Sequence, residues 1–264
     1  VLHDGDPEPV RVITLRGDIK GYQEANSLVL PKRATIIAGG NITNLGVVAQ
    51  NLADSEVSRI EAGGKIVFES TRNSTGGLAT NTKGLEWGGP GRLELVAGGT
   101  IDLGSSKGVV TRGNLGNAFL PEGGTGVLVQ AGAAAADYAG FLDWLERPEQ
   151  AKVRELGAYT SLGSDAARAA FLAQADSKEL LRDYFYAILR GVGRSAASAG
   201  GAKDYSGGYD AIAALFPEAN GPYHGNIDMF FSQLKTEQGG GIDLMAPGGR
   251  VNAGLAVSRG LSKG

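Results

Sequence analysis

Residues 16–18 are the part of the sequence most readily interpreted as a binding motif. Arg16-Gly17-Asp18 spells the short peptide that many host-cell integrins recognise. The triplet also aligns with a repeat that recurs along the chain, in which Gly17 takes a corner glycine position and Ile19 takes the next inward apolar position. Arg16 and Asp18 would then be the free positions of a solvated turn. We favour this structural interpretation and keep receptor binding at Arg16, Gly17 and Asp18 as the alternative.

Three aspartates form the pattern that would suit acid–base chemistry. Asp102, Asp228 and Asp243 each follow an isoleucine of the repeat, so they could stack as a ladder on one outward face. Two carboxylates about 5 Å or about 7 to 9 Å apart can catalyse glycoside hydrolysis. Like charges stacked in register destabilise a sheet unless they are spaced or bind a cation. We therefore interpret the aspartates as ordinary outward polar positions, and we expect no catalytic residue.

The other candidates for chemistry are isolated. His3 and His224 are too few for a metal site or a catalytic triad, and the absence of cysteine excludes disulfides and thiolate ligands. The run Gly191-Val-Gly-Arg-Ser-Ala196 fits a dinucleotide fingerprint only superficially, because it follows a helical pattern and not a strand. We expect no metal and no cofactor.

Trp87 stands before a Gly-Gly-Pro turn, in what we expect to be a long loop between two repeats. An exposed aromatic side chain on such a loop can stack on a sugar. A contact that anchors the loop is the interpretation we favour. Sugar binding by Trp87 remains the alternative.

Composition excludes several classes of partner. The chain has 264 residues, a formal net charge of −3 and 42% hydrophobic residues. This balanced charge gives no electrostatic footprint for nucleic acid. No apolar run approaches the roughly 18 residues needed to span a bilayer, so we expect no integral membrane segment. The lack of cysteine would suit export of an unfolded chain, and the absence of a signal peptide before Val1 leads us to expect a segment of a longer protein.

Glycine punctuates the chain between short apolar runs. The 43 glycines far exceed the usual proportion of about 7%, and they lack the three-residue period of collagen. An Ala-Gly-Gly element recurs at Ala38, Ala62 and Ala97 and, with one proline inserted, at Ala246. One variable residue and then Ile or Val follow each element. We expect positive φ angles at these Gly-Gly corners.

The repeat predicts stacked units. The first two intervals between the alanines are 24 and 35 residues, and the longer one fits a single unit with an extended loop. One such unit cannot bury its apolar face alone, whereas units stacked in parallel at about 4.8 Å can. The sequence therefore predicts a mainly β fold, a right-handed parallel β-helix of roughly seven to nine coils. A β-sandwich of hairpins is the alternative, although hairpin turn signals are sparse.

The middle of the chain has a helical pattern. Helices are expected at 137–146, 165–175, 177–193 and 209–215. Ser177 suits an N-cap, and Gly191 and Gly193 suit a helix end. Because the repeat returns at Gly225, we divide the chain into β-helix coils over 1–132, an α-helical insertion over 133–224 and resumed coils over 225–264.

Four runs in the second half are distinctive. They begin Phe185-Tyr-Ala-Ile-Leu-Arg, Gly208-Tyr-Asp-Ala-Ile-Ala, Gly225-Asn-Ile-Asp-Met-Phe and Gly240-Gly-Ile-Asp-Leu-Met. Together they resemble a conserved region of large filamentous-haemagglutinin-family exoproteins. The resemblance covers about 130–260, while the first half resembles only the family's general β-helical repeats. The Asn-Pro-rich motifs of the family's amino-terminal secretion domain are missing from these residues.

The resemblance implies a structural and adhesive segment of a secreted bacterial surface protein. Such proteins leave the cell by two-partner secretion, and another part of the parent chain would engage the outer-membrane transporter. We expect a rigid stalk at the bacterial cell surface, with the helical insertion as a module for attachment to a host-cell or surface receptor or glycan. The alternative is a β-helical polysaccharide-active enzyme or a carbohydrate-binding scaffold.

Overall fold

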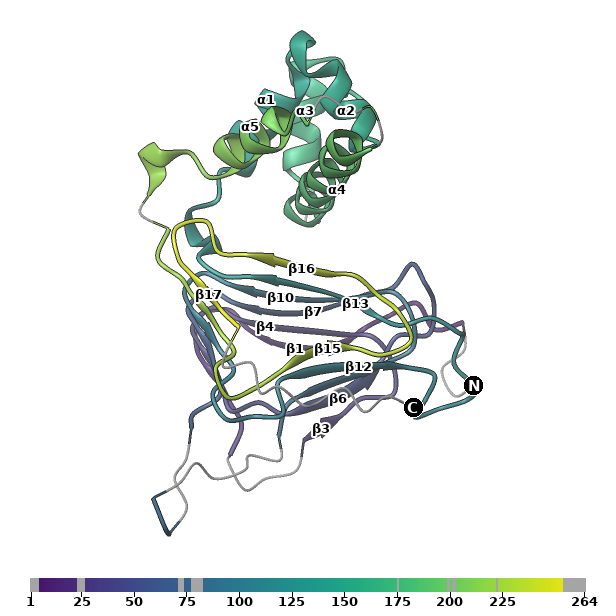
Figure 1. The fold of residues 1–264 in the computed structure, drawn as a ribbon, viewed down its shortest axis with the longest axis vertical. Helices are drawn as coiled ribbons and strands as arrows, with labels where there is room; N and C mark the ends of the chain where they lie inside the picture. The colour runs from purple at the N-terminus through teal and green to yellow at the C-terminus, as the bar shows by residue number, and fades with distance from the viewer. Residues whose placement is uncertain are drawn as a thin grey trace. The chain divides into compact units, whose positions relative to one another are not determined.

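The computed structural model divides into two compact units (Figure 1). Unit 1 comprises 1–134 and 223–264, and unit 2 comprises 135–222. The helical insertion expected at 133–224 begins and ends close to the limits of unit 2. The structure describes residues 5–22, 27–70, 74–76, 83–174, 176–198, 200, 203–221 and 223–253.

Unit 1 consists of three parallel sheets, with 17 strands in its described residues. Sheet A contains β1 (Val10–Thr14), β4 (Ala34–Ala38), β7 (Val57–Ala62), β10 (Arg92–Ala97), β13 (Gly126–Gln130) and β16 (Ile242–Met245). Sheet B contains β2 (Ile19–Lys20), β5 (Ile42–Thr43), β8 (Ile66–Val67), β11 (Ile101–Asp102), β14 (Ile227–Asp228) and β17 (Val251–Asn252). Sheet C contains β3 (Leu28–Val29), β6 (Val47–Gln50), β9 (Leu85–Gly88), β12 (Val109–Gly113) and β15 (Leu234–Thr236).

Successive strands pass from sheet A to sheet B to sheet C and back to sheet A. We call one such passage a rung. Ala38 pairs with Ala62, and Ala62 pairs with Ala97, so the long second interval is one rung with an extended loop, as predicted. Parallel pairing rules out the sandwich of hairpins and is compatible with a parallel β-helix-like fold. Sheet A has six strands in the described residues, fewer than the seven to nine coils expected of the whole chain.

Alternation along the strands builds the core of unit 1. Ala34, Ile36 and Ala38 of β4 point inward and are buried, and the residues between them are only partly covered. The isoleucine that follows each glycine corner forms a column in sheet B. Four of its members are at most 2% exposed: Ile42, Ile66, Ile101 and Ile227. Burial of each such side chain contributes about 1.5 to 3 kcal/mol, so the column explains the Gly-x-Ile pattern.

The glycine corners work differently from the sequence prediction. Gly39, Gly40, Gly63 and Gly64 do not have positive φ angles, so that expectation was wrong. The corners require glycine because neighbouring rungs approach too closely for a side chain. A Cβ on Gly39 would lie 2.0 Å from the Leu15 carbonyl oxygen, and one on Gly63 would lie 2.3 Å from that of Gly39.

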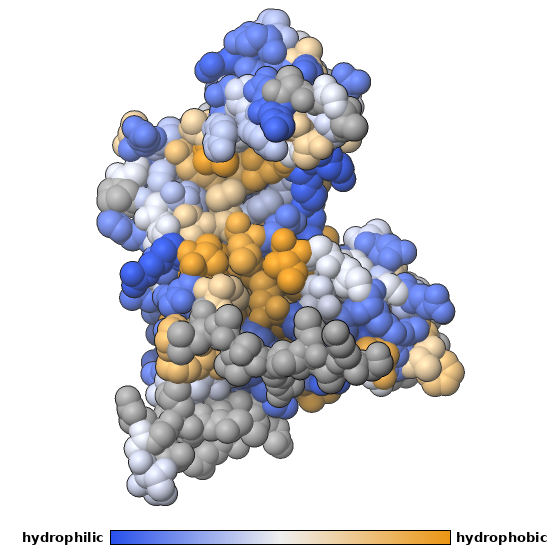
Figure 2. All heavy atoms as spheres, viewed as in Figure 1, coloured by the Kyte–Doolittle hydropathy of each residue, from blue (hydrophilic) through white to orange (hydrophobic). Residues whose placement is uncertain are grey.

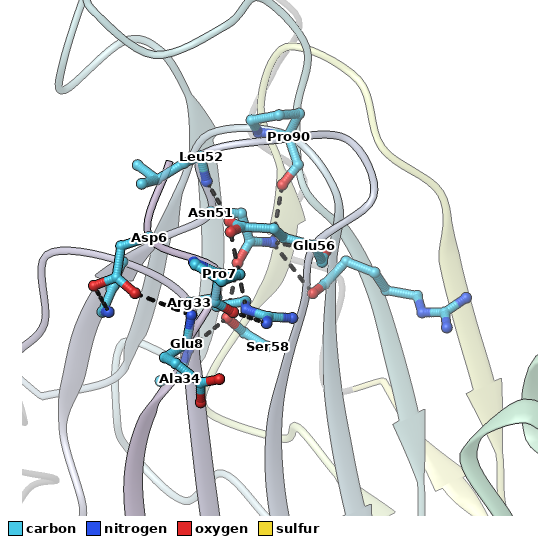
Figure 3. A network of polar contacts seen from close by, with 12 residues as sticks. Asp6, Pro7, Glu8, Arg33, Ala34, Asn51, Leu52, Glu56, Ser58 and Pro90 are labelled. Atoms are coloured by element: carbon cyan, nitrogen blue, oxygen red, sulfur yellow. Dashed lines mark hydrogen bonds and ion pairs between the residues drawn. The ribbon is translucent and has the colours of Figure 1, made fainter. Parts of the chain in front are cut away.

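A buried polar network joins the rungs where sheet C returns to sheet A (Figure 3). The Ser58 hydroxyl donates to Asn51 Oδ1 at 2.7 Å and accepts from the Ala34 amide at 3.0 Å. Asn51 Nδ2 donates to the Pro90 carbonyl at 2.9 Å. Asn51 and Ser58 are fully buried. The side chain of Asn51 thus links the Ser58 hydroxyl to the backbone carbonyl of Pro90 through buried hydrogen bonds.

Apolar side chains gather on the face of unit 1 that carries β16, which is drawn in yellow in Figure 1 (Figures 1 and 2). β16 and β17 are the last described strands of sheets A and B. Ile242 and Val251 are in register with the buried Val127 and Ile227, yet they are 43% and 44% exposed. Core positions therefore reach the surface where the described strands end.

Unit 2 is helical and has an aromatic core. Its helices are α1 (Tyr138–Glu146), α2 (Ala151–Leu156), α3 (Asp165–Leu172), α4 (Ser177–Ala197) and α5 (Ser206–Leu215), with 3-10 turns at Pro148–Gln150 and Glu218–Asn220. Phe185 of α4 packs edge-on against Phe141 of α1 and against Phe216, with ring centroids 5.8 and 5.9 Å apart. None of the described helices is long and apolar enough to cross a membrane.

Helix α4 departs from its predicted ends. Ser177 is its first helical residue, Asp176 occupies the N-cap position, and the helix continues through Gly191 and Gly193 to Ala197. Gly191 allows close packing on α2, because a Cβ there would lie 2.4 Å from the Leu156 carbonyl oxygen. A glycine needed for helix contact was thus mistaken for a helix end.

Glu146, the last residue of α1, holds the loop that follows α2. Its Oε1 accepts the Tyr159 hydroxyl at 2.5 Å and the Leu162 amide at 3.0 Å, and its Oε2 accepts from Ser161 at 2.7 Å. Partial burial disfavours the ionised carboxylate. The hydrogen bonds from Tyr159, Leu162, Ser161 and Gly163 outweigh that effect and lower the pKa of Glu146 to about 2.

The first prediction concerns the buried network. Asn51→Ala should lower the free energy of unfolding by about 2 to 4 kcal/mol, because it leaves several buried groups unpaired. Chemical denaturation measures the change. Asp54→Ala, at an exposed position of the following loop, is the matched control and should have little effect. Equal stabilities of the two variants would contradict this role for Asn51.

The second prediction concerns pH. The folded pKa of Glu146 lies below its ordinary value of 4.5, so the ionised carboxylate stabilises unit 2 above that value. This contribution is lost as the pH falls through about 4.5 to about 2. Glu146→Gln should destabilise unit 2 by about 1 to 3 kcal/mol at neutral pH and remove this part of the acid dependence. Melting followed by near-UV circular dichroism tests both, and an unchanged acid profile would refute the assignment.

Candidate functional site

Arg16, Gly17 and Asp18 lie exposed at the corner between β1 and β2. The Gly17 amide donates to the Thr14 hydroxyl at 3.1 Å, and its carbonyl accepts from the Gly40 amide of the next rung at 2.9 Å. Ile19 pairs with Ile42. The triplet therefore occupies the repeat corner to which the sequence assigned it.

The sequence had suggested that Asp18 is a free position. In the structure its carboxylate instead hydrogen-bonds to the next rung. Its Oδ1 accepts the Asn41 amide at 2.7 Å and the Asn41 side-chain nitrogen at 3.3 Å. The same relation recurs in other rungs, where Asn41 Oδ1 accepts the Lys65 amide at 2.9 Å and Asn226 Oδ1 accepts the Arg250 amide at 3.1 Å. The variable residue of the repeat thus often supplies a rung-to-rung acceptor.

Asp18 also borders a hollow of about 700 Å³ on the outward side of sheet B, which we call the Asp18 hollow. Tyr22 is 81% exposed at its rim. Opposite it, Asn44 and Glu69 exchange two hydrogen bonds, at 2.7 and 2.8 Å. An exposed aromatic face beside amide and carboxylate groups can stack on a sugar and hydrogen-bond its hydroxyls. Lys20, Tyr22, Asn44 and Glu69 were missed by sequence reasoning, because several separate rungs contribute them.

Trp87 does not lie on a loop. It belongs to β9, points inward between Ala49 and Thr111, and has no exposed surface. The expected loop at Trp87 is therefore wrong, and the alternative of sugar binding fails because solvent cannot reach the ring. The strand pattern Leu85-Glu-Trp87 alternates inward and outward, which was the signal in the sequence for a core position.

The three aspartates do not form one ladder. Asp102 and Asp228 are register partners in sheet B, whereas Asp243 pairs with Leu128 in sheet A. Asp102 accepts a hydrogen bond from the Gly104 amide at 2.9 Å. His224 is exposed, and His3 lies outside the described residues. No group of three or more His, Cys, Asp or Glu side chains suited to a metal ion occurs in the part of the chain that the structure describes.

Unit 2 has a groove of its own, of about 500 Å³, between α2, α4 and α5. Val153, Leu156 and Val192 form its apolar part. Glu149 and Asp210 stand exposed at its rim.

Comparison with known proteins gives no relative from which to transfer a role. No protein-family model, curated protein or solved structure matches the chain.

The third prediction uses the paired aspartates. Asp228→Asn should stabilise unit 1 by about 0.2 to 1 kcal/mol, because it removes a like charge directly opposite Asp102. Denaturation at low salt measures the gain, which should shrink as salt screens the repulsion. Glu122→Gln, at an exposed position elsewhere, is the control for the change in net charge. The double variant with Asp102→Asn should show non-additive energies, and additivity would count against the repulsion.

Proposed function

We propose that the chain is a structural and adhesive segment of a large secreted bacterial surface exoprotein. In this proposal unit 1 is a right-handed parallel β-helix, a solenoid that serves as a rigid stalk. Unit 2 is a helical module displayed by the stalk for attachment to a host cell or another surface. The segment has no catalytic role.

The observation that carries the proposal is the way the sheets continue past unit 2. β14 follows the helical residues, yet Ile227 and Asp228 pair in register with Ile101 and Asp102 of the preceding rung. The chain also leaves and re-enters unit 1 at one point, since a Cβ on Gly225 would lie 2.4 Å from the backbone nitrogen of Gly132. The stacking therefore does not need the helices, which suits a module added to a stalk.

The resemblance of 130–260 to filamentous-haemagglutinin-family exoproteins supports the same assignment. It suggests a protein secreted by the two-partner route and held at the cell surface, with the transporter bound by another part of the parent chain. Attachment would use the groove of unit 2, with its apolar residues and exposed carboxylates, as the first contact surface. The exposed Arg16 and the Asp18 hollow are the second.

A carbohydrate-binding scaffold is the second candidate. The observation in its favour is the Asp18 hollow, where Tyr22 offers an aromatic face beside hydrogen-bonding side chains. The enzymatic form of this candidate would need paired acidic groups in a groove. Asp102 and Asp228 are neighbours, but neither lines the Asp18 hollow, the groove of unit 2 or a third groove on sheet C.

The fourth prediction tests the attachment role. Residues 137–222 can be replaced by a short Gly/Ser linker, because Gly132 and Gly225 already lie together. The shortened protein should keep its strand signal in circular dichroism and its stability in unit 1, but lose binding to host cells or to a glycan panel.

A second variant separates the two surfaces. Asp18→Glu keeps the charge and alters the Arg-Gly-Asp geometry, so integrin-dependent attachment should be unchanged if unit 2 binds. Undiminished binding after removal of unit 2 would contradict its role and move attention to the Asp18 hollow. A protein that binds no cell or glycan in either form would contradict the adhesive proposal as a whole.

A further inference from the structure

Sheet C carries a groove on its outward side that no feature discussed above explains. It has a volume of about 280 Å³ and crosses the strands, with lining residues from β6, β9, β12 and β15. We call it the sheet C groove. Its charged lining residues are Glu86, Lys107, Arg112, Lys235 and Glu237.

One lining residue, Gly84, packs closely on the neighbouring rung. A Cβ on Gly84 would lie 2.7 Å from the Gly108 carbonyl oxygen, so no larger residue fits. Val48 and Val110 are outward residues of β6 and β12, and they flank Glu86 of β9 in one register column. The floor is thus a narrow apolar strip interrupted by a carboxylate.

Charged side chains occupy the rest of the lining. Arg112 pairs with Glu86 at 2.9 Å, and Lys235 pairs with Glu237 at 2.5 Å. The hydrogen bond from Lys235 lowers the pKa of Glu237, so that carboxylate stays ionised. Lys107 is exposed and makes no ion pair with any residue that the structure describes. The groove therefore holds one more cation than carboxylate, and the unpaired cation is Lys107.

The chemistry of these groups limits the ligand. The strand backbones beneath the groove are already paired with one another in sheet C, so only side chains can contact a ligand. An extended peptide would therefore gain no backbone hydrogen bonds there. A sugar chain needs acceptors for its hydroxyls, which Glu86 and Glu237 supply, and a small apolar strip for its C–H faces. A carboxylate on the sugar would meet the surplus cation.

Spacing supports the same ligand. Neighbouring strands of sheet C lie about 4.8 Å apart, which is about the length by which one pyranose ring extends a linear chain. A chain laid across the strands would therefore place successive sugars over successive rungs. Lys107 and Arg112 come from the rung of β12, and Lys235 comes from the next rung.

We propose that the sheet C groove binds a linear polysaccharide made of carboxylate-bearing sugars, with the chain running across the strands and a carboxylate at Lys107. This site lies within unit 1 and does not depend on attachment by unit 2. The stalk role assigns no ligand to sheet C, whereas this proposal assigns it an acidic polysaccharide.

The fifth prediction tests this site by titration calorimetry on the intact chain. The probe is a short oligogalacturonate at low ionic strength, and a neutral oligosaccharide of the same length is the control. Lys107→Ala should weaken oligogalacturonate binding by about fivefold to tenfold, through loss of a charge-assisted contact. Lys107→Arg should retain most of it. Lys65→Ala, an exposed lysine at the corner between sheets A and B, should bind like the unaltered chain.

Three results would overturn the proposal. The first is no binding of oligogalacturonate by the unaltered chain, and the second is equal binding by the Lys107→Ala and Lys65→Ala variants. The third is equal binding of a polyglutamate peptide of matching charge, which would indicate general attraction of anions. Because the same measurements can be made after replacement of 137–222, failure of this site is distinguishable from failure of the attachment role.

Discussion

The close approach of neighbouring rungs at the glycine corners is the constraint on which unit 1 depends. A Cβ at Gly39, Gly63, Gly98 or Gly249 would meet a carbonyl oxygen of an adjacent rung at between 1.9 and 2.3 Å. Because the backbones can touch there, the strands on both sides stay in register, and the isoleucines that follow, Ile42, Ile66 and Ile101, enter a buried column. The polar residue between glycine and isoleucine can then hydrogen-bond the next rung, as Asp18 does with Asn41. The close approach of the backbones thus explains the buried isoleucines, the strand register and the hydrogen bonds made by the polar corner residues.

A scaffold of this kind leaves three places where chemistry can vary without loss of the stack. The outward columns of the sheets can change freely, and the Asp18 hollow and the sheet C groove both lie on them. Loops can lengthen, as between β8 and β9. A whole module can also be inserted at a corner, as between Gly132 and Gly225. The functional proposals for this chain all concern such places, and none of them involves the buried columns.

Much of the architecture could be predicted from the sequence, because the Gly-x-Ile corner repeats visibly at Ala38, Ala62 and Ala97. Parallel pairing and the long second rung followed from this repeat, and the helical segment followed from the spacing of its apolar residues. Corner geometry did not, since a glycine needed for close approach looks the same in sequence as one needed for positive φ. Trp87 was misplaced because the length of the interval suggested a loop where a strand resumes. The hollows were missed for a further reason: residues such as Lys107 and Lys235 come together only through stacking of distant rungs.

The stack of strands continues in register across the helical unit, and one engineered cross-link can test this continuity. The chain has no cysteine, so an introduced pair is unambiguous. Asp102→Cys with Asp228→Cys joins register partners on adjacent strands about 4.8 Å apart, within the range for a disulfide. We expect rapid and complete disulfide formation in this pair, and none between Asp102→Cys and Asp243→Cys, which lie in different sheets. Free thiols in the first pair, or equal cross-linking in both, would contradict it.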